Sequence, residues 1–154
     1  MDYKNLTSPC GRDCFNCTFY LAAHNPRLKQ LVAKRMGLSP EIVECEGCRN
    51  IEGKCTLIIG LGLGEQCRIY RCSKEKGVSF CYECEKFPCL LLHPVADKAE
   101  KLPHNIKVYN LCRIQKVGII KWAEEEAKQS FERYFKEKLE SFIGEKTENV
   151  KTKD

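Results

Sequence analysis

Twelve cysteines dominate the chemistry that this 154-residue chain could perform, and eleven of them lie in its first 92 residues. Three pairs have the spacing C-x2-C, which curls a chain into a tight turn whose two sulfurs can face one tetrahedral metal ion at ~2.3 Å. Glycine favours such a turn, and Gly47 lies inside one of the pairs. The pairs are Cys14/Cys17, Cys45/Cys48 and Cys81/Cys84. This pattern predicts metal binding by clustered thiolates.

Five further cysteines lie in the same segment and complete a set of eleven predicted metal ligands. The set is Cys10, Cys14, Cys17, Cys45, Cys48, Cys55, Cys67, Cys72, Cys81, Cys84 and Cys89. Such a set would form two or three sites, and the spacing alone leaves the division among sites open. A cysteine without a metal is usually a small buried hydrophobe. That is our prediction for Cys112, which lies apart from the others in a predicted amphipathic helix.

All-sulfur sites suit both zinc and iron–sulfur clusters. The ferredoxin spacing C-x2-C-x2-C-x3-C-P is absent, because the proline near Cys89 precedes that cysteine. The run Cys10-x3-Cys14-x2-Cys17 has the spacing of the cluster motif in radical S-adenosylmethionine enzymes. Those enzymes resemble α/β barrels well over this length, and their Gly-Gly-Glu contact is not found here. Zinc is therefore the favoured cofactor, and an iron–sulfur redox or electron-transfer accessory protein is the alternative.

Hydropathy and the first residues of the sequence indicate where the protein resides. No apolar run approaches the ~18 residues of a membrane helix. The start, Met1 to Leu6, lacks the basic and apolar stretches of a secretory signal. We therefore expect a cytoplasmic protein that does not enter a membrane. In reducing cytosol, clustered cysteines serve metals or redox chemistry instead of structural disulfides.

The formal net charge of +5 favours a nucleic-acid partner only if the thiols stay neutral. Twelve thiolates around three divalent ions would remove twelve charges and return six, which leaves −1. Lysine and arginine also alternate with acidic residues instead of forming a basic block. A zinc-knuckle nucleic-acid-binding protein is therefore the second alternative, and another protein is the expected partner.

Catalytic patterns are not evident in the spacing of the remaining reactive residues. The chain has three histidines, and neither a Ser-His-Asp nor a Cys-His arrangement can be argued from their positions. The carboxylates are scattered without a paired acid and base. The sequence thus favours a non-catalytic binding or accessory module over an enzyme.

Capping residues and apolar periodicity predict where helices lie. Asn25 suits an N-cap and Pro26 a first helical position, so a helix should begin there and end before Gly37. Apolar spacing predicts further helices at about 119–142 and 106–115, and a short helical turn at 39–40. The stripe of the long helix should comprise Ile120, Ala123, Ala127, Phe131, Tyr134, Phe135, Leu139 and Phe142.

The predicted fold is an α-rich, small α+β fold in one compact domain, residues 1–154. Residues 1–92 would form a metal-stapled, cysteine-rich part with irregular knuckles and short strands. Residues 93–144 would be helical, and 145–154 would be a frayed tail.

Four cysteine motifs carry a family resemblance. They are Cys10-Gly11-Arg12-Asp13-Cys14-Phe15-Asn16-Cys17, Cys45-Glu46-Gly47-Cys48, Cys67-Arg68-Ile69-Tyr70-Arg71-Cys72 and Cys81-Tyr82-Glu83-Cys84-Glu85-Lys86-Phe87-Pro88-Cys89. Over roughly residues 8–90 the chain resembles the small cysteine-rich prokaryotic proteins catalogued as domain of unknown function 3795. Arg12 stands where members often have an apolar residue. The resemblance implies a prokaryotic origin and metal binding, without an established activity.

Overall fold

The computed structural model describes residues 1–60, 64–94 and 105–137, which form short helices joined by turns. The N-terminal elements are η1 (Cys14–Asn16), α1 (Thr18–Ala23) and α2 (Pro26–Met36). The middle of the chain contains α3 (Thr56–Gly60), α4 (Arg68–Glu75), η2 (Cys81–Glu83) and η3 (Leu90–Leu92). The C-terminal elements are α5 (Lys107–Val117), α6 (Ile119–Lys121), the π-helical turn η4 (Trp122–Glu126) and α7 (Ala127–Lys136).

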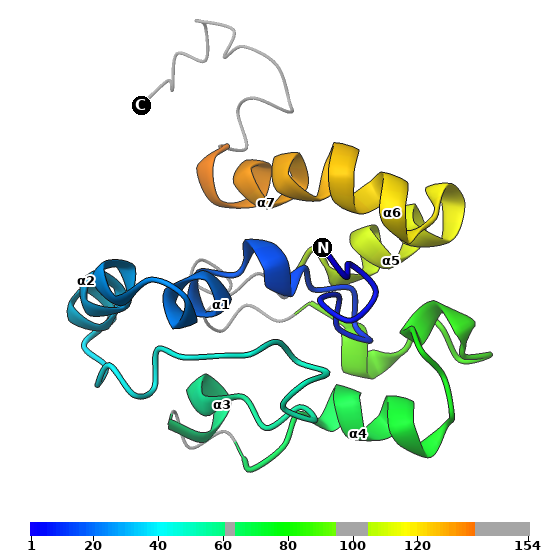
Figure 1. The fold of residues 1–154 in the computed structure, drawn as a ribbon. Coiled ribbons are helices and arrows are strands. Elements are labelled where there is room, and N and C mark those ends of the chain that lie inside the picture. The colour runs from blue at the N-terminus through cyan, green and yellow to red at the C-terminus, as the bar shows by residue number, and fades with distance from the viewer. Residues whose placement is uncertain (61–63, 95–104, 138–154) are drawn as a thin grey trace, which may run out of the picture.

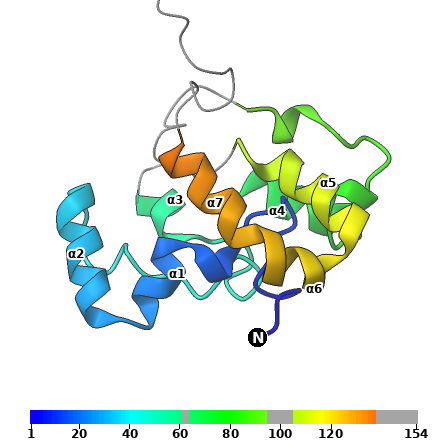
Figure 2. The same cartoon turned by 90° about the horizontal axis from the view of Figure 1, so that it is seen from above.

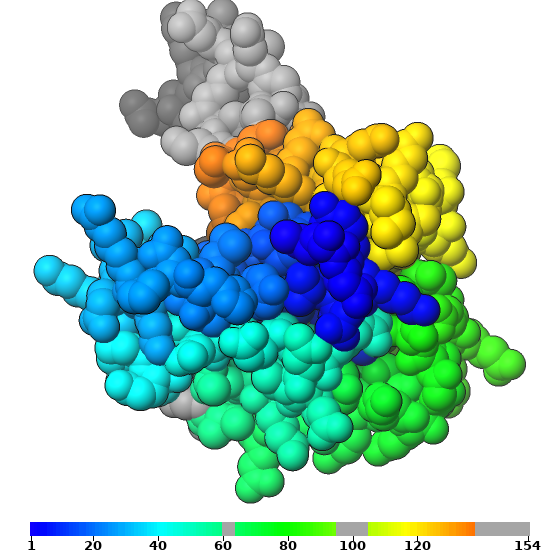
Figure 3. All heavy atoms as spheres, in the orientation of Figure 1, coloured from blue at the N-terminus to red at the C-terminus, as the bar shows by residue number. Residues whose placement is uncertain are grey.

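The N-terminal segment lies between the other two groups of helices. Figure 1 shows α5, α6 and α7 on one side of this segment and α3 and α4 on the other. Seen from above, α7 crosses over the segment that carries α1 (Figure 2). The space-filling view shows α6 and α7 packed directly against N-terminal residues (Figure 3). Residues distant in sequence thus share one interior.

The predicted helix after Asn25 is confirmed as α2. The Asn25 side chain accepts a hydrogen bond from the Leu28 N–H at 3.1 Å, and Pro26 occupies the first turn. Gly37 ends the helix in the left-handed conformation, with φ +66°, which costs glycine little. Local sequence alone therefore accounts for both ends of α2.

The C-terminal helices pack on the N-terminal segment through Trp122, which is fully buried. Its ring meets the edge of Phe15, with ring centroids 6.0 Å apart. The rest of this apolar cluster consists of Leu6, Ile114, Ala123 and Ala127. The sequence-predicted helix at 106–115 is confirmed as α5.

The predicted long C-terminal helix is confirmed from Ile119 to Lys136, but it contains a π-helical turn and ends earlier than predicted. The π-helical turn η4 adds a residue to one turn, which rotates the following face, and Phe135 of the predicted stripe is exposed. Ile120, which precedes this turn, is also exposed, whereas Ala123 and Ala127 are buried. Glu137 is extended, so α7 ends at Lys136. Residues 138–142 of the prediction and the predicted tail 145–154 lie outside the described residues.

The predicted short strands are also wrong. In the described part of the chain, the β-structure is one isolated bridge between Thr7 and Asp13. Residues 39–43 form hydrogen-bonded turns, with Ile42 N–H donating to Ser39 and Val43 N–H to Pro40, instead of a helix. In such turns the backbone N–H and C=O groups bond to each other locally and are not available to pair with a neighbouring strand.

No helix among the described residues has the length and hydrophobicity that crossing a bilayer requires.

Candidate metal centre

The eleven predicted ligands line two cavities, and Cys112 lines neither. We name the cavities by their cysteines. The seven-cysteine cavity contains Cys10, Cys14, Cys17, Cys45, Cys48, Cys55 and Cys67. The four-cysteine cavity contains Cys72, Cys81, Cys84 and Cys89. The fold therefore places these cysteines around two spaces.

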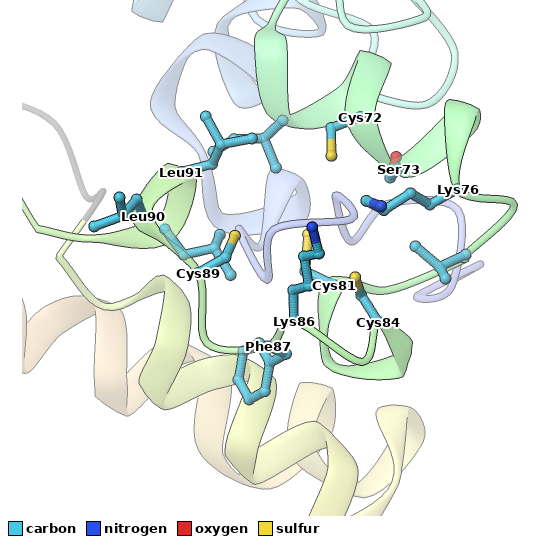
Figure 4. A pocket seen from close by; sticks show the side chains of 13 residues that line it. Cys72, Ser73, Lys76, Cys81, Cys84, Lys86, Phe87, Cys89, Leu90 and Leu91 are labelled. Atoms are coloured by element: carbon cyan, nitrogen blue, oxygen red, sulfur yellow. The ribbon is translucent and has the colours of Figure 1, made fainter.

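The four-cysteine cavity has a volume of about 380 Å³ and a largely apolar wall. Figure 4 shows Cys72 entering it from α4, Cys81 and Cys84 from η2, and Cys89 from the segment before η3. The Cys84 N–H donates to the Cys81 carbonyl at 3.1 Å, which closes the predicted C-x2-C turn. Three segments of the chain thus supply four sulfurs.

Cys81 experiences both burial and the charge of the other cysteines. Burial raises its pKa to about 12, together with negative charge on Cys10, Cys89, Cys72 and Cys84. A thiolate in this cavity is therefore unfavourable unless a positive ion accompanies it. The influence of Cys10 indicates that the two cavities adjoin, as does the Cys81 N–H bond to the Pro9 carbonyl at 2.9 Å.

The seven-cysteine cavity, of about 130 Å³, is lined by four stretches of the chain: 8–20, 45–58, Cys67 and Lys107. Cys14 begins η1, and Cys17 and Cys67 are the N-caps of α1 and α4. The chain bends between Cys45 and Cys48, with Gly47 at φ +92°. The Cys48 N–H points to the Cys14 Sγ at 3.5 Å. Sulfurs that are up to 57 positions apart in sequence consequently face one space.

Four of these cysteines form what we call the Cys48 group: Cys10, Cys14, Cys48 and Cys67. Burial raises the pKa of Cys48, and negative charge on Cys10, Cys14 and Cys67 raises it further. Burial also raises the pKa of Cys14 to about 11. Cys10, Cys14 and Cys67 therefore lie close enough to Cys48 for their charge to affect it.

The remaining three form the Cys45 group: Cys17, Cys45 and Cys55. All three pack against one apolar cluster around Phe19 and Leu57. The hydrogen bond from the Cys45 thiol to Cys55 raises the pKa of Cys45, as do burial and charge on Cys55 and Cys17. The same bond lowers the pKa of Cys55 to about 6. Geometry and electrostatics thus define a second group in this cavity.

Arg12 is a feature of the seven-cysteine cavity that the sequence did not assign. Its Nη2 lies 3.5 Å from the Cys17 Sγ. Burial alone would lower the pKa of the guanidinium, but negative charge on Cys17, Cys10, Cys14 and Cys55 outweighs it and raises the pKa. Arg12 therefore supplies positive charge where thiolates would form. The only signal in the sequence was its departure from the apolar residue common in the resembling family.

All twelve cysteines are free thiols. Within residues 1–60, 64–94 and 105–137, no three cysteine, histidine, aspartate or glutamate side chains converge as the ligands of one metal ion do. Each sulfur can be moved within its cavity by a change of χ1 rotamer. The fold thus gathers the eleven cysteines around two spaces without joining them around an ion.

The prediction that Cys112 is buried is wrong, because its side chain is exposed. The buried residues of α5 are Asn110, Leu111 and Ile114. The Asn110 Nδ2 donates to the Gly11 carbonyl at 2.9 Å in the interior. The apolar pattern assigned Cys112 to the buried face of α5, but Asn110 lies on that face and Cys112 does not. The hydrogen bond of Asn110 holds α5 against the Cys10 loop.

No curated protein and no solved structure matches the chain. Residues 6–94 match the family described as "Protein of unknown function (DUF3795)". The match covers more than half of the chain and ends before α5, so it includes every cysteine of both cavities. It agrees with the resemblance predicted over residues 8–90. The chain therefore belongs to the DUF3795 family.

Proposed function

We propose that this protein binds metal ions through the cysteine thiolates of its two cavities, that the ions are zinc, and that it is a non-catalytic binding or accessory module. The observation that carries the proposal is the gathering of eleven cysteines around two shared spaces. Cysteines that serve only as small hydrophobes pack among apolar side chains. Several of the eleven also pack against apolar side chains, but nine of them are only partly buried, and all eleven face empty volume.

The donor set fits zinc. Zn²⁺ prefers four tetrahedral ligands, and C-x2-C turns are common in its structural sites. Burial raises the pKa of the Cys14 and Cys81 thiols. A coordinating thiol nevertheless loses its proton outright, because the charge of the metal ion outweighs the effect of burial. Rotation of side chains about χ1 would bring the sulfurs together. An iron–sulfur cluster uses the same donors, so the metal itself must be measured.

A bound ion would supply cohesion that this part of the chain otherwise lacks. Among the described residues between Cys45 and Cys89 the longest helix, α4, has eight residues, and of those residues only Leu57 and Phe80 are buried members of the apolar clusters. Structural zinc binding contributes ~10–16 kcal/mol, which equals or exceeds the stability of a typical domain. The proposed role of the metal is therefore to fold the cysteine-rich part.

Elemental analysis of protein purified anaerobically without added metal tests the proposal. We expect two or three zinc ions per chain and a colourless protein. Iron together with visible absorption would replace zinc by the iron–sulfur alternative. Less than one zinc or iron per chain would contradict metal binding altogether.

A matched pair of variants localises the ions. Cys84→Ala removes a sulfur from the four-cysteine cavity, so that site should lose its ion or bind it much more weakly. Cys112→Ala changes an exposed side chain outside both cavities and should leave the metal content unchanged, with stability within ~0.5 kcal/mol of the parent. Loss of an ion in Cys112→Ala would mean that all twelve cysteines are ligands.

A further inference from the structure

The four-cysteine cavity is much larger than the metal ion that we propose for it. Four sulfurs at ~2.3 Å from a zinc ion lie on a sphere of only about 50 Å³. The cavity has a volume of about 380 Å³, whereas the seven-cysteine cavity, with more sulfurs, has about 130 Å³. Pockets that bind small organic molecules begin at about 300 Å³. Metal binding therefore accounts for only part of this space.

The wall of the cavity suits an apolar molecule. Leu90 is 89% exposed although it lines the cavity, so a ligand against it would remove apolar surface from water. One water takes up ~30 Å³ of liquid, so the cavity has room for on the order of ten non-hydrogen atoms beside an ion. Six apolar side chains line it: Ile69, Val78, Phe87, Leu90, Leu91 and Leu92.

Two lysines give this cavity a positive charge. Lys76 at the end of α4 and Lys86, between η2 and η3, both line it (Figure 4), and no carboxylate is among the described residues of its wall. Within the described ranges neither lysine forms an ion pair. The hydroxyl of Ser73, which also lines the cavity, donates to the Tyr70 carbonyl at 2.7 Å. The two ammonium groups therefore favour an anionic group on the ligand.

The two lysines do not serve to balance the charge of the thiolates, as Arg12 does in the other cavity. Arg12 lies 3.5 Å from the Cys17 sulfur. In the part of the chain that the structure describes, neither Lys76 nor Lys86 donates a hydrogen bond to a sulfur. Both lysines are exposed, whereas the four cysteines of this cavity are partly buried. Their charge is therefore available to a ligand that enters from solvent.

We infer that the four-cysteine cavity binds a small organic anion with an apolar body, in addition to its proposed metal ion. The apolar body packs against the leucines and Phe87, and the anionic group pairs with Lys76 and Lys86. This inference goes beyond metal binding and does not depend on which metal the cysteines hold. Octanoate has the size and charge that the cavity selects and is a suitable probe.

Titration of octanoate into the full chain, followed by ¹H–¹⁵N correlation spectra, tests the inference. We expect amide signals of residues 69–92 to shift and those of α2 to stay. Acetate lacks the apolar body and 1-octanol lacks the charge, so each should bind at least roughly tenfold more weakly. Lys76→Met with Lys86→Met should weaken octanoate binding roughly tenfold, and arginine at both positions should restore most of the affinity.

Lys74→Met is the matched control. Lys74 is exposed on the same helix, α4, but does not line the cavity, so its loss should leave octanoate binding unchanged. A folded protein whose signals in residues 69–92 do not respond to octanoate would overturn the inference. Binding of 1-octanol as tight as that of octanoate, or full octanoate affinity in the folded double methionine variant, would also overturn it.

Metal content is measured separately in every protein of the series. Less than one metal ion per chain would contradict the proposed function, and the octanoate titration would still decide this inference. Full metal content without an octanoate response would overturn the anion site and leave metal binding intact.

Discussion

The C-terminal helices and the cysteine-rich region fill their interiors differently. Around α5 to α7 the buried residues are Trp122, Leu111, Ile114 and small alanines, together with the hydrogen-bonded Asn110, and they fill the space as a mainly apolar core. In the cysteine-rich region two cavities lie between short helices, and thiols line them. Apolar burial can order the first region by itself. The cysteine-rich region has cavities in place of packed side chains, and we propose that metal ions in these cavities contribute to its stability.

Metal removal should give the largest difference between the two regions. A strong chelator should abolish the amide dispersion of residues 45–89, because ~10–16 kcal/mol of binding energy is lost there. Signals from α5 should change less. The measurement is a ¹H–¹⁵N correlation spectrum before and after verified metal removal, and an unchanged spectrum would show that apolar packing suffices throughout.

Trp122→Ala should give the opposite pattern. Trp122 is fully buried against Phe15, so its loss should lower the free energy of unfolding by about 3–5 kcal/mol. Metal per folded chain should not change. Ile120→Ala is the control, because Ile120 lies beside it in sequence but is 54% exposed. Denaturant titration and metal analysis check both variants, and loss of metal from folded Trp122→Ala would show that the regions are not independent.

Gly11→Ala tests the contact between the two regions. Gly11 has φ +84°, and a Cβ there would lie 2.8 Å from the Lys107 carbonyl and 2.9 Å from the Leu111 Cγ. Gly118 has the same φ with open space around it, so Gly118→Ala carries the strain without the clash. We expect Gly11→Ala to cost about 1–3 kcal/mol more than Gly118→Ala. Equal unfolding free energies for the two variants would mean that α5 can shift away from residue 11 at little cost in stability.

Glu126→Gln should have the smallest effect. Arg113 donates to both carboxylate oxygens of Glu126, at 2.8 and 2.6 Å, and these bonds lower the pKa of Glu126. Because the folded pKa is depressed, the stabilisation is present above the ordinary pKa of glutamate and is lost as pH falls through the folded value. The variant should lower Tm by about 2 °C at pH 7. If the Tm of Glu126→Gln stays below that of the parent at a pH where Glu126 is protonated, the charge of Glu126 is not the cause of the stabilisation.

The sequence predicted the features that neighbouring residues determine. Asn25, Pro26 and Gly37 define the ends of α2, and the pairs at Cys14/Cys17 and Cys81/Cys84 form the tight turns that their spacing indicated. Each of these features depends on residues within a turn or two of one another.

The features that were missed depend on contacts between distant segments. The seven-cysteine cavity requires residues from four stretches of the chain to meet. Cys112 was misplaced because apolar periodicity does not anticipate a buried asparagine whose partner, Gly11, is 99 positions away. The π-helical turn at Trp122 likewise follows from tertiary packing, which overrides a regular period.

The hydrogen bond between Asn110 and Gly11 has a consequence for synthesis of the chain. At ~5–20 residues per second, Asn110 is made roughly 5–20 s after Gly11. During that interval the Cys10 loop exists without the helix that holds it. The contact that holds this loop in the folded protein therefore cannot form until more than two thirds of the chain has been made.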